Sequence, residues 1–309
     1  MTKEVDAIEP NAVADIPGPD LNTKTPHPKA PPGSCDCHHH IFGAPNKVAL
    51  NPGRQYTPAE GTLAQFRSRS KVLGIENSVV VQPSTYGINN DFICAQVEAL
   101  GENGRGIAVT DMTTSDADLE KLNKAGYKGT RFNVAASGGT PLSELAPVAE
   151  RIAPMGWNIQ FFLQVSKSMV ELQDQISRLP VPVVIDHMGA PDLSVGGPEQ
   201  PGFQALINLL KEGNTYVKLC GAYRLDFTGN PWPAADPFAR ALIEAAPEQC
   251  VWGSDWPHPY CIEPDGKTLA PMPNDGDLFD RLWDWTDHDE DLWKKILVDN
   301  PSKLYGFNK

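Results

Sequence analysis

Residues 34–43 read SCDCHHHIFG and place three consecutive histidines behind an aspartate and two cysteines. Imidazole, carboxylate and thiolate are the side chains that bind transition metals best. The segment lies well inside the chain, whereas histidine tags lie at chain ends. On a strand, His38 and His40 would point to one face and His39 to the other. We therefore interpret His38 and His40 as a candidate catalytic or metal-binding pair.

Other reactive side chains follow short apolar runs further along the chain. His187 follows the run in PVVIDHM, and Asp255 and His258 follow the run in CVWGSDWPHP. A carboxylate between two tryptophans is poorly solvated and needs a cation or hydrogen-bond donors. The alternatives are a hydrogen-bonded core imidazole at His187 and a helix N-cap at Asp255. We predict that His38, His40, His187, Asp255 and His258 form the catalytic group.

Two arginines are candidates for binding an anionic substrate. Guanidinium offers a planar fork that binds a carboxylate through two hydrogen bonds. Arg131 lies within the strand-like run GTRFN, where a surface ion pair is harder to arrange, and Arg224 has a weaker position. A surface ion pair remains the alternative for either arginine. The full set of predicted substrate-binding residues is Arg131, Arg224, Ser84, Tyr86, Lys218 and Arg54.

The chain alternates strand-like runs with helix-like segments such as 62–74, 116–126 and 143–156. The runs are residues 34–42, 78–84, 106–112, 129–134, 158–165, 182–188, 215–221 and 250–257. Buried parallel strands appear as continuous apolar runs, and eight of them match a (β/α)₈ barrel. An open, doubly wound sheet is the alternative, but no G-x-G-x-x-G follows the first run. The predicted fold class is therefore α/β, a single (β/α)₈ barrel.

Composition indicates where the barrel begins and which classes of partner are excluded. Residues 1–33 contain seven prolines, which predicts an extended segment without regular structure, either a flexible leader or an arm on the surface, and we expect residues 34–309 to form the barrel. The net charge of −13 argues against nucleic-acid binding, and no apolar run is long enough for a membrane span. Without a secretory signal, we expect a cytoplasmic protein whose six cysteines are reduced and buried. The oligomeric state stays open between a monomer and a small homo-oligomer.

With these residues in place, the chain resembles the lactone-processing branch of the amidohydrolase superfamily. The motifs that carry the resemblance are DCHHHIFG, VVVQPSTYGINN, GTRFN, PVVIDHMG, VWGSDWPHP and DNPSKLYGF, in the expected order. The resemblance implies metal ligands at His38, His40, His187 and Asp255. It implies one divalent ion, Zn²⁺ or Mn²⁺, or a reaction without metal, because the branch includes metal-independent members.

The resemblance also implies an activity. We expect hydrolysis of a small anionic lactone, carboxylated or sulfonated, in aromatic-compound catabolism, such as 4-sulfomuconolactone or a pyrone dicarboxylate. Asp255 would be the general base that activates water. The alternatives are a sugar-acid lactone isomerase, a metal-dependent decarboxylase of the same superfamily, and a barrel that only binds a ligand.

Overall fold

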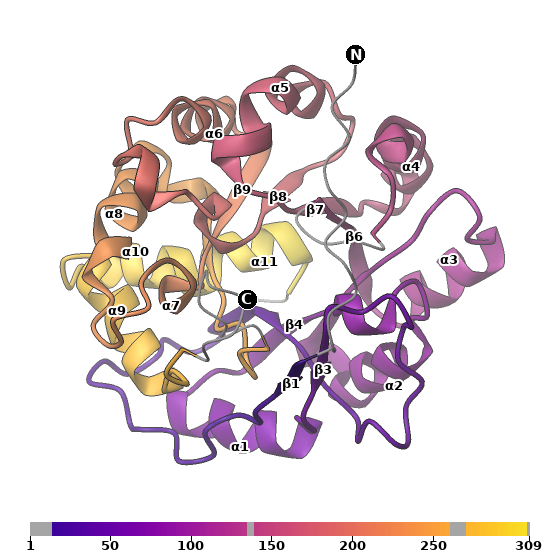
Figure 1. Cartoon of the computed structure of the whole chain (residues 1–309), viewed down its shortest axis with the longest axis horizontal. Coiled ribbons are helices and arrows are strands. Elements are labelled where there is room, and N and C mark those ends of the chain that lie inside the picture. The colour runs from indigo at the N-terminus through magenta and orange to yellow at the C-terminus, as the bar shows by residue number, and fades with distance from the viewer. Residues whose placement is uncertain (1–13, 135–138, 260–269, 308–309) are drawn as a thin grey trace.

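The computed structural model describes residues 14–134, 139–259 and 270–307. Eight parallel strands form one sheet in the order β10-β9-β8-β7-β6-β5-β4-β2. They are β2 (Cys35–His39), β4 (Asn77–Val81), β5 (Gly104–Ala108), β6 (Tyr127–Asn133), β7 (Asn158–Phe162), β8 (Val183–Ile185), β9 (Thr215–Leu219) and β10 (Cys250–Trp252). Each strand falls within or next to one predicted run, and the helices surround the sheet (Figure 1). The predicted barrel is confirmed, and the open-sheet alternative is wrong.

The helices cover the outside of the barrel and follow the strands in alternation. They are α1 (Leu63–Leu73), α2 (Asp91–Leu100), α3 (Asp116–Lys124), α4 (Leu145–Ile152), α5 (Val165–Ser177), α6 (Pro201–Glu212), α7 (Ala222–Leu225), α8 (Asp236–Ala245), α9 (Asp275–Trp285), α10 (Glu290–Lys294) and α11 (Asn300–Tyr305). Local sequence sets the ends of α1: Thr62 and Gln65 form a capping box, and Gly74 ends the helix with φ +79°. No described helix is long and apolar enough to cross a membrane.

The barrel closes where β2 meets the segment that follows β10. The Asp255 amide donates to the His38 carbonyl at 2.8 Å, and the His40 amide donates to the Trp256 carbonyl at 2.7 Å. This approach requires glycine at position 253, because a Cβ there would lie 2.5 Å from the His38 Cβ. The closure therefore brings the two histidines of β2 and the carboxylate of Asp255 together.

Strand β2 carries a register shift between Asp36 and His39. A bulge of this kind changes which residues point inward. Cys37 packs in the apolar cluster at the amino-terminal end of the barrel, and His38, its neighbour in sequence, joins the polar network in the interior. His39 points outward and stacks on Phe66 of α1, with ring centroids 3.6 Å apart. The bulge thus places His38 inside the barrel.

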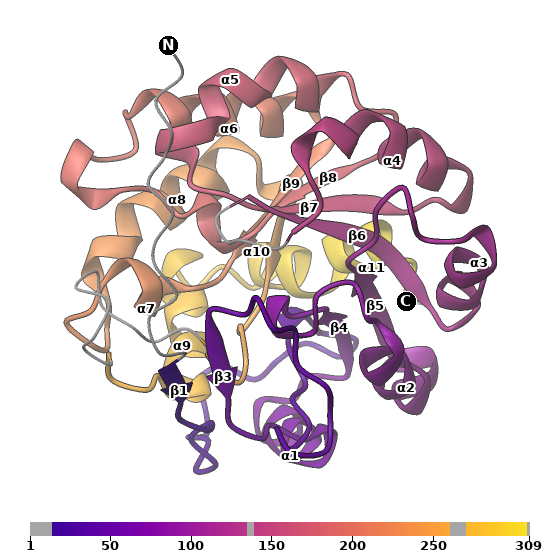
Figure 2. The same cartoon turned by 45° about the vertical axis from the view of Figure 1, so that its right-hand side comes forward.

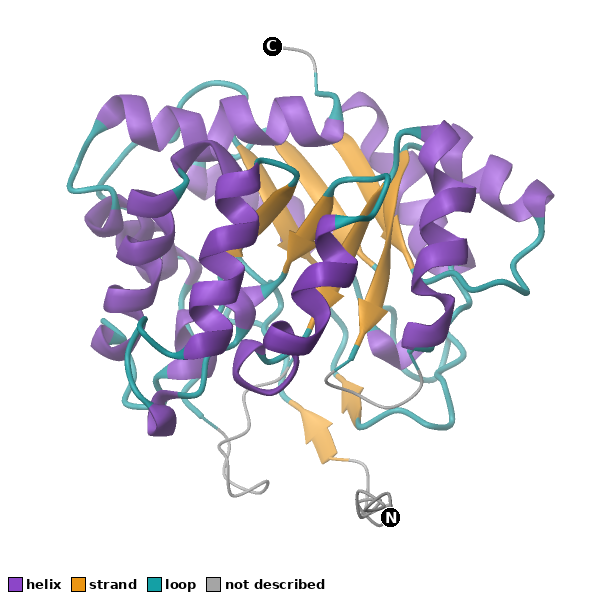
Figure 3. Cartoon of the chain, turned by 90° about the horizontal axis from the view of Figure 1, so that it is seen from above, coloured by secondary structure: helices purple, strands orange, loops and turns teal. Residues whose placement is uncertain are grey.

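The described part of the leader is an arm on the barrel surface. Its residues Ala14–Ile16 form β1, which pairs in parallel with β3 (Tyr56–Pro58), so the expectation of no regular structure is wrong there. Further along the arm, Lys24 and His27 form ion pairs with Asp277 and Asp280 of α9. The two short strands lie at the end of the barrel to which the strand arrows point (Figures 2 and 3). The boundary at residue 33 stays a prediction.

The cysteines in the described residues are free thiols. Cys35, Cys37, Cys94, Cys220 and Cys250 are all buried, which confirms the prediction for them. Cys261 lies outside the described residues.

Candidate active site

A cavity of about 350 Å³ opens at the carboxyl ends of the strands. Its polar lining includes His40, Tyr56, Ser84, Arg131, His187 and Arg224. These residues come from strands or loops that are far apart in sequence. They meet because all parallel strands of a barrel end on the same face.

Local backbone geometry orients the side chains of two of the site residues. His187 follows β8 with φ 53°, and Asp255 follows β10 with φ 63°. Non-glycine residues adopt such left-handed conformations rarely, and active sites are one place where they collect. The chain turns sharply at each of these residues as it leaves its strand.

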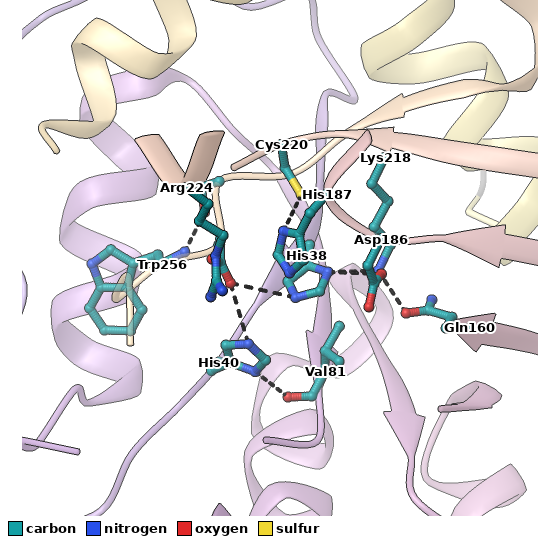
Figure 4. A network of polar contacts seen from close by, with 12 residues as sticks. His38, His40, Val81, Gln160, Asp186, His187, Lys218, Cys220, Arg224 and Trp256 are labelled. Atoms are coloured by element: carbon teal, nitrogen blue, oxygen red, sulfur yellow. Dashed lines mark hydrogen bonds and ion pairs between the residues drawn. The ribbon is translucent and has the colours of Figure 1, made fainter. Parts of the chain in front are cut away.

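Three imidazoles point toward one another in the interior (Figure 4). The ring centroids of His38 lie 5.1 Å from His40 and 4.8 Å from His187. Burial, followed by the nearby Lys218 ammonium, lowers the pKa of His38 to about 3. Burial also lowers the pKa of His187 well below its ordinary value. Both rings are therefore neutral at physiological pH.

Asp255 is the carboxylate at the centre of this group. Its Oδ2 accepts hydrogen bonds from Tyr223 and, at 2.7 Å, from Nε of Arg224. Its Oδ1 lies 3.6 Å from Nε2 of His38 and 3.5 Å from Nε2 of His40. Burial alone would raise the pKa of Asp255, but the Arg224 guanidinium holds it well below its ordinary value. Asp255 is thus an ionised carboxylate inside the protein.

A second buried carboxylate, Asp186, lies on the other side of His38. Its Oδ2 accepts from Nε of Arg131 at 2.9 Å, and its Oδ1 lies 3.0 Å from Nζ of Lys218. Lys218 also contacts Nδ1 of His38 at 2.9 Å and Oε1 of Gln160 at 2.7 Å. Burial would raise the pKa of Asp186, but the Lys218 ammonium and the other neighbouring charges lower it strongly. This network forms the floor beneath the cavity.

Arg131 of β6 and Arg224 of α7 line the same cavity. Both guanidinium groups lie over the ring of Phe162, at 5.4 Å and 5.8 Å from its centroid. Each arginine binds its carboxylate through Nε, so the carboxylates Asp186 and Asp255 hold the two forks in place. Two cationic groups therefore flank one aromatic surface, an arrangement suited to a planar anion.

Some predicted binding residues have other contacts. Lys218 lies fully buried beneath the cavity and bonds to protein groups. The Tyr86 hydroxyl accepts from the Gly43 amide at 3.1 Å, and Arg54 donates to Thr57 and to the Asn51 carbonyl. The structure places none of these three side chains in the described cavity lining, because their polar groups serve neighbouring segments instead.

His258, predicted as catalytic, lies behind Asp255. Its ring is buried, packs edge-on against Tyr223 and faces Asp275 at 3.5 Å. His258 therefore adjoins the tyrosine that binds Asp255 and lies outside the described lining of the cavity.

Several buried residues in and around the site were not predicted from the sequence. Asp186 directly precedes His187 and follows the apolar run of β8, and that position was a signal for it. Cys220 contacts Nδ1 of His187 at 3.1 Å, and nothing in the sequence pattern relates these two residues. Arg69 of α1, which binds Asp36 and Asp275 at 2.8 Å each, carried no signal either.

Two groups of side chains have the spacing of metal ligands. His38, His40 and Asp255 form one, and His38, His187 and Cys220 form the other, each with ligand atoms within 4.8 Å of one another. All four predicted ligands thus converge, although His38 and Asp255 lie below the cavity surface rather than in its lining.

Three characterised proteins share sequence with nearly the whole chain. The 2-pyrone-4,6-dicarboxylate hydrolase of Comamonas testosteroni is 35% identical, with 92% of this chain and 93% of the relative covered. The 4-sulfomuconolactone hydrolase of Hydrogenophaga intermedia is 32% identical, with 89% of each chain covered. The D-galactarolactone isomerase of Agrobacterium fabrum is 29% identical, with 92% of this chain and 95% of the relative covered.

The fold and the family agree with these similarities. A protein of Acinetobacter baumannii, solved with citric acid bound, superposes with a TM-score of 0.75 at 26% identity, covering 89% of this chain and all of that one. The amidohydrolase family matches residues 35–307, which span every strand of the barrel. The chain therefore belongs to the amidohydrolase family.

Proposed function

We propose that this protein hydrolyses a lactone that carries a carboxylate or a sulfonate. The observation that supports it most is the ionised, buried Asp255, whose Oδ1 faces two imidazoles at the base of a cavity flanked by two arginines. Two of the relatives are named as hydrolases of anionic lactones. A lactone needs a base for water, donors for the developing oxyanion and a site for its charged group, and the cavity offers groups for each.

Water activation involves Asp255 and His40. Nδ1 of His40 donates to the Val81 carbonyl at 2.8 Å, so the tautomer with this proton has its lone pair on Nε2. This nitrogen and Oδ1 of Asp255 are both acceptors, 3.5 Å apart. A water molecule donating one proton to each would be oriented for attack on the ring carbonyl.

The chemical step balances with this chain's own residues. The water oxygen bonds to the carbonyl carbon while Asp255 takes its proton. The bond between that carbon and the ring oxygen then breaks, and the proton passes to the departing oxygen. The imidazole N–H of His187, which lines the cavity, would stabilise the oxyanion between these two events.

The charged group of the substrate would bind at the arginines. Arg131 and Arg224 lie over Phe162, so a flat, conjugated acid could stack on the ring and bind both forks. The Ser84 side chain in the lining adds a hydroxyl. Lys218 and Arg54 are not proposed as direct substrate contacts, because their polar groups bind protein atoms.

The donor set fits a divalent metal only in part. His40 has the arrangement of a metal-bound imidazole, because its other nitrogen donates to a carbonyl. His38 has the reverse arrangement: the donor-only ammonium of Lys218 faces its Nδ1, so the ring proton belongs on Nε2, where the metal would bind. Three cations, Arg131, Lys218 and Arg224, already outnumber the two carboxylates of the described network. We therefore derive no step from a metal and propose a reaction by side chains alone.

An isomerase is the second candidate. The cavity lining contains the amides Gln55, Asn133 and Gln164, which suit the hydroxyl groups of a sugar acid, and one relative is a lactone isomerase. Isomerisation would use the same base on a substrate hydroxyl in place of water.

The two candidates differ in whether water is consumed. Purified protein would be incubated with a carboxylated or sulfonated muconolactone, a pyrone dicarboxylate and a sugar-acid lactone in ¹⁸O-labelled water. Hydrolysis predicts one equivalent of acid released per turnover and ¹⁸O in the new carboxylate. A new lactone without label would support the isomerase, and no turnover beyond that of an Asp255→Asn control would contradict both.

A further inference from the structure

The protons on the buried histidines decide what the site can do. A neutral imidazole has one N–H donor and one acceptor nitrogen, and the partner of one nitrogen determines the role of the other. His38, His40 and His187 each have a protein partner at Nδ1. These three partners are different in kind.

At His38 the partner is a donor. The ammonium of Lys218 has three protons and no lone pair. Three acceptors surround it: Oε1 of Gln160 at 2.7 Å, Nδ1 of His38 at 2.9 Å and Oδ1 of Asp186 at 3.0 Å. Asp186 also lies 3.2 Å from Nδ1 of His38, but a proton on that nitrogen would point at the ammonium. The arrangement therefore leaves the proton of His38 on Nε2, facing Oδ1 of Asp255.

At His187 the partner is a thiol, the side chain of Cys220. Sγ of Cys220 lies 3.1 Å from Nδ1 of His187, and both side chains are buried. A neutral thiol can donate its proton or accept one weakly at sulfur. When the Cys220 thiol donates to Nδ1, the ring proton of His187 is on Nε2.

At His40 the partner is an acceptor, the Val81 carbonyl at 2.8 Å. Its proton is on Nδ1 and its Nε2 is an acceptor. The three rings therefore present two donors and one acceptor at the base of the cavity, and Figure 4 shows the partners on the outer side of each ring.

We propose that Lys218 and Cys220 are positioning residues that fix His38 and His187 with their protons on Nε2. His187, which lines the cavity, then donates to the lactone carbonyl oxygen as it becomes an oxyanion, and the N–H of His38 faces Oδ1 of Asp255, which accepts from the water together with His40. The expected effect on kcat depends on the proposed hydrolysis, but the assignment of the tautomers does not. The same arrangement explains why an ammonium and a thiol lie in the floor of the site without contacting the cavity.

The tautomers are measurable in the wild-type protein. Selective ¹⁵N labelling of its seven histidines, with ring nitrogens correlated to ring protons by NMR, distinguishes a protonated nitrogen from an unprotonated one. Histidine-to-glutamine variants of single positions assign the signals. We expect His38 and His187 to be protonated on Nε2 and His40 on Nδ1. A proton on Nδ1 of either His38 or His187 would overturn the proposal, whatever the protein's activity.

Substitution then tests the two donors. Cys220→Ser keeps a hydroxyl donor, so we expect kcat within about threefold of wild type, whereas Cys220→Ala should lower kcat about 10–100-fold with little change in KM. Cys250→Ala is the matched control, because Cys250 is also buried on a neighbouring strand but bonds only to the Ala246 carbonyl. Equal kcat in Cys220→Ala and Cys250→Ala would contradict the role of Cys220.

Lys218→Met removes the other donor and leaves Nδ1 of His38 facing the Asp186 carboxylate at 3.2 Å. We expect the ring proton to move to Nδ1 in this variant. Retention of the Nε2 proton in a folded Lys218→Met protein would show that Lys218 does not set the tautomer. If this variant does not fold, the wild-type spectrum still decides the question.

Discussion

Two buried networks of charged side chains lie near His38, and they use the same residue types for different purposes. In the seam network, Arg69 of α1 joins Asp36 of β2 to Asp275 of α9, and Ser254 donates to Asp36 through both its amide and its hydroxyl. In the cavity network, Asp186 and Asp255 bind Arg131, Lys218 and Arg224. The seam network joins the first and last strands of the barrel.

The difference lies in whether each guanidinium lines the cavity. Arg69 uses both terminal nitrogens on carboxylates and its side chain is 3% exposed, so it serves only the fold. Arg131 and Arg224 use Nε on their carboxylates and line the cavity. A buried arginine therefore marks a binding site only when its fork faces a cavity, a distinction that residue type does not reveal.

The largest expected effect is on the cavity side, at Asp255. Asp255→Asn should lower kcat about 10²–10⁴-fold, because an amide does not accept the proton of the attacking water. The melting temperature should also fall, because Arg224 loses its buried carboxylate partner, so turnover is compared at a temperature at which the variant is folded. A variant with more than about a tenth of wild-type turnover would be incompatible with a general base.

The pH profile gives a second view of the same residue. The neighbouring charges hold the pKa of Asp255 well below its ordinary value of about 4, so the acid limb of kcat should lie below that pH. The limb should be absent from the residual activity of Asp255→Asn.

On the seam side, Arg69→Met should act on stability. Removing one partner from a buried ion pair leaves an uncompensated charge and costs about 3–5 kcal/mol of unfolding free energy. Denaturant titration would measure it, with Arg67→Met as the control, because Arg67 lies on the same helix but is exposed. A loss below about 1 kcal/mol would show that the seam network contributes little to closing the barrel.

Arg131→Met tests the cavity network for its role in anion binding. Loss of a desolvated charge partner costs about 2–5 kcal/mol, or at least about thirtyfold in affinity, for an anionic lactone. A neutral lactone of the same ring should lose far less. Equal losses in KM for the two substrates would show that Arg131 supports the fold, as Arg69 does.

The stability that the seam network provides should depend on pH through Asp275. Burial would raise its pKa, but Arg69 and His258 lower it to about 2. The resulting stabilisation, about 2–3 kcal/mol, is complete well above the unfolded value of about 3.9 and is lost as the pH falls toward 2. Denaturant midpoints between pH 6 and 2.5 should fall more steeply for wild type than for Asp275→Asn. Parallel curves would contradict the shift.

The smallest expected effect concerns metal. Because the cavity network already has more cations than carboxylates among the described residues, chelation with EDTA should change kcat less than about twofold. Added Zn²⁺ should give no gain. Loss of activity on chelation that Zn²⁺ restores would contradict the proposed metal-free reaction and assign His38 and Asp255 as ligands.

Much of the frame follows from sequence pattern. The eight runs predict the eight strands, because burial on both faces makes most positions of a parallel strand apolar. The strand ends then predict His38, His40, His187, Asp255 and Arg131 as neighbours, since every strand of a barrel ends on the same face. The alternation in β2 was only partly predictable, because the bulge after Asp36 interrupts it.

By itself, the sequence determined the barrel, its eight strands and the convergence of the histidines with Asp255. Tertiary structure alone decided the partner of each buried group: Lys218 at His38, Cys220 at His187, and Arg69 at Asp36 and Asp275. The physical reason is that periodicity is a local property of the sequence, which indicates only which face of an element is buried. Hydrogen bonds and ion pairs between distant segments depend on differences in distance of a few tenths of an ångström, and only the packing of the whole chain determines these distances.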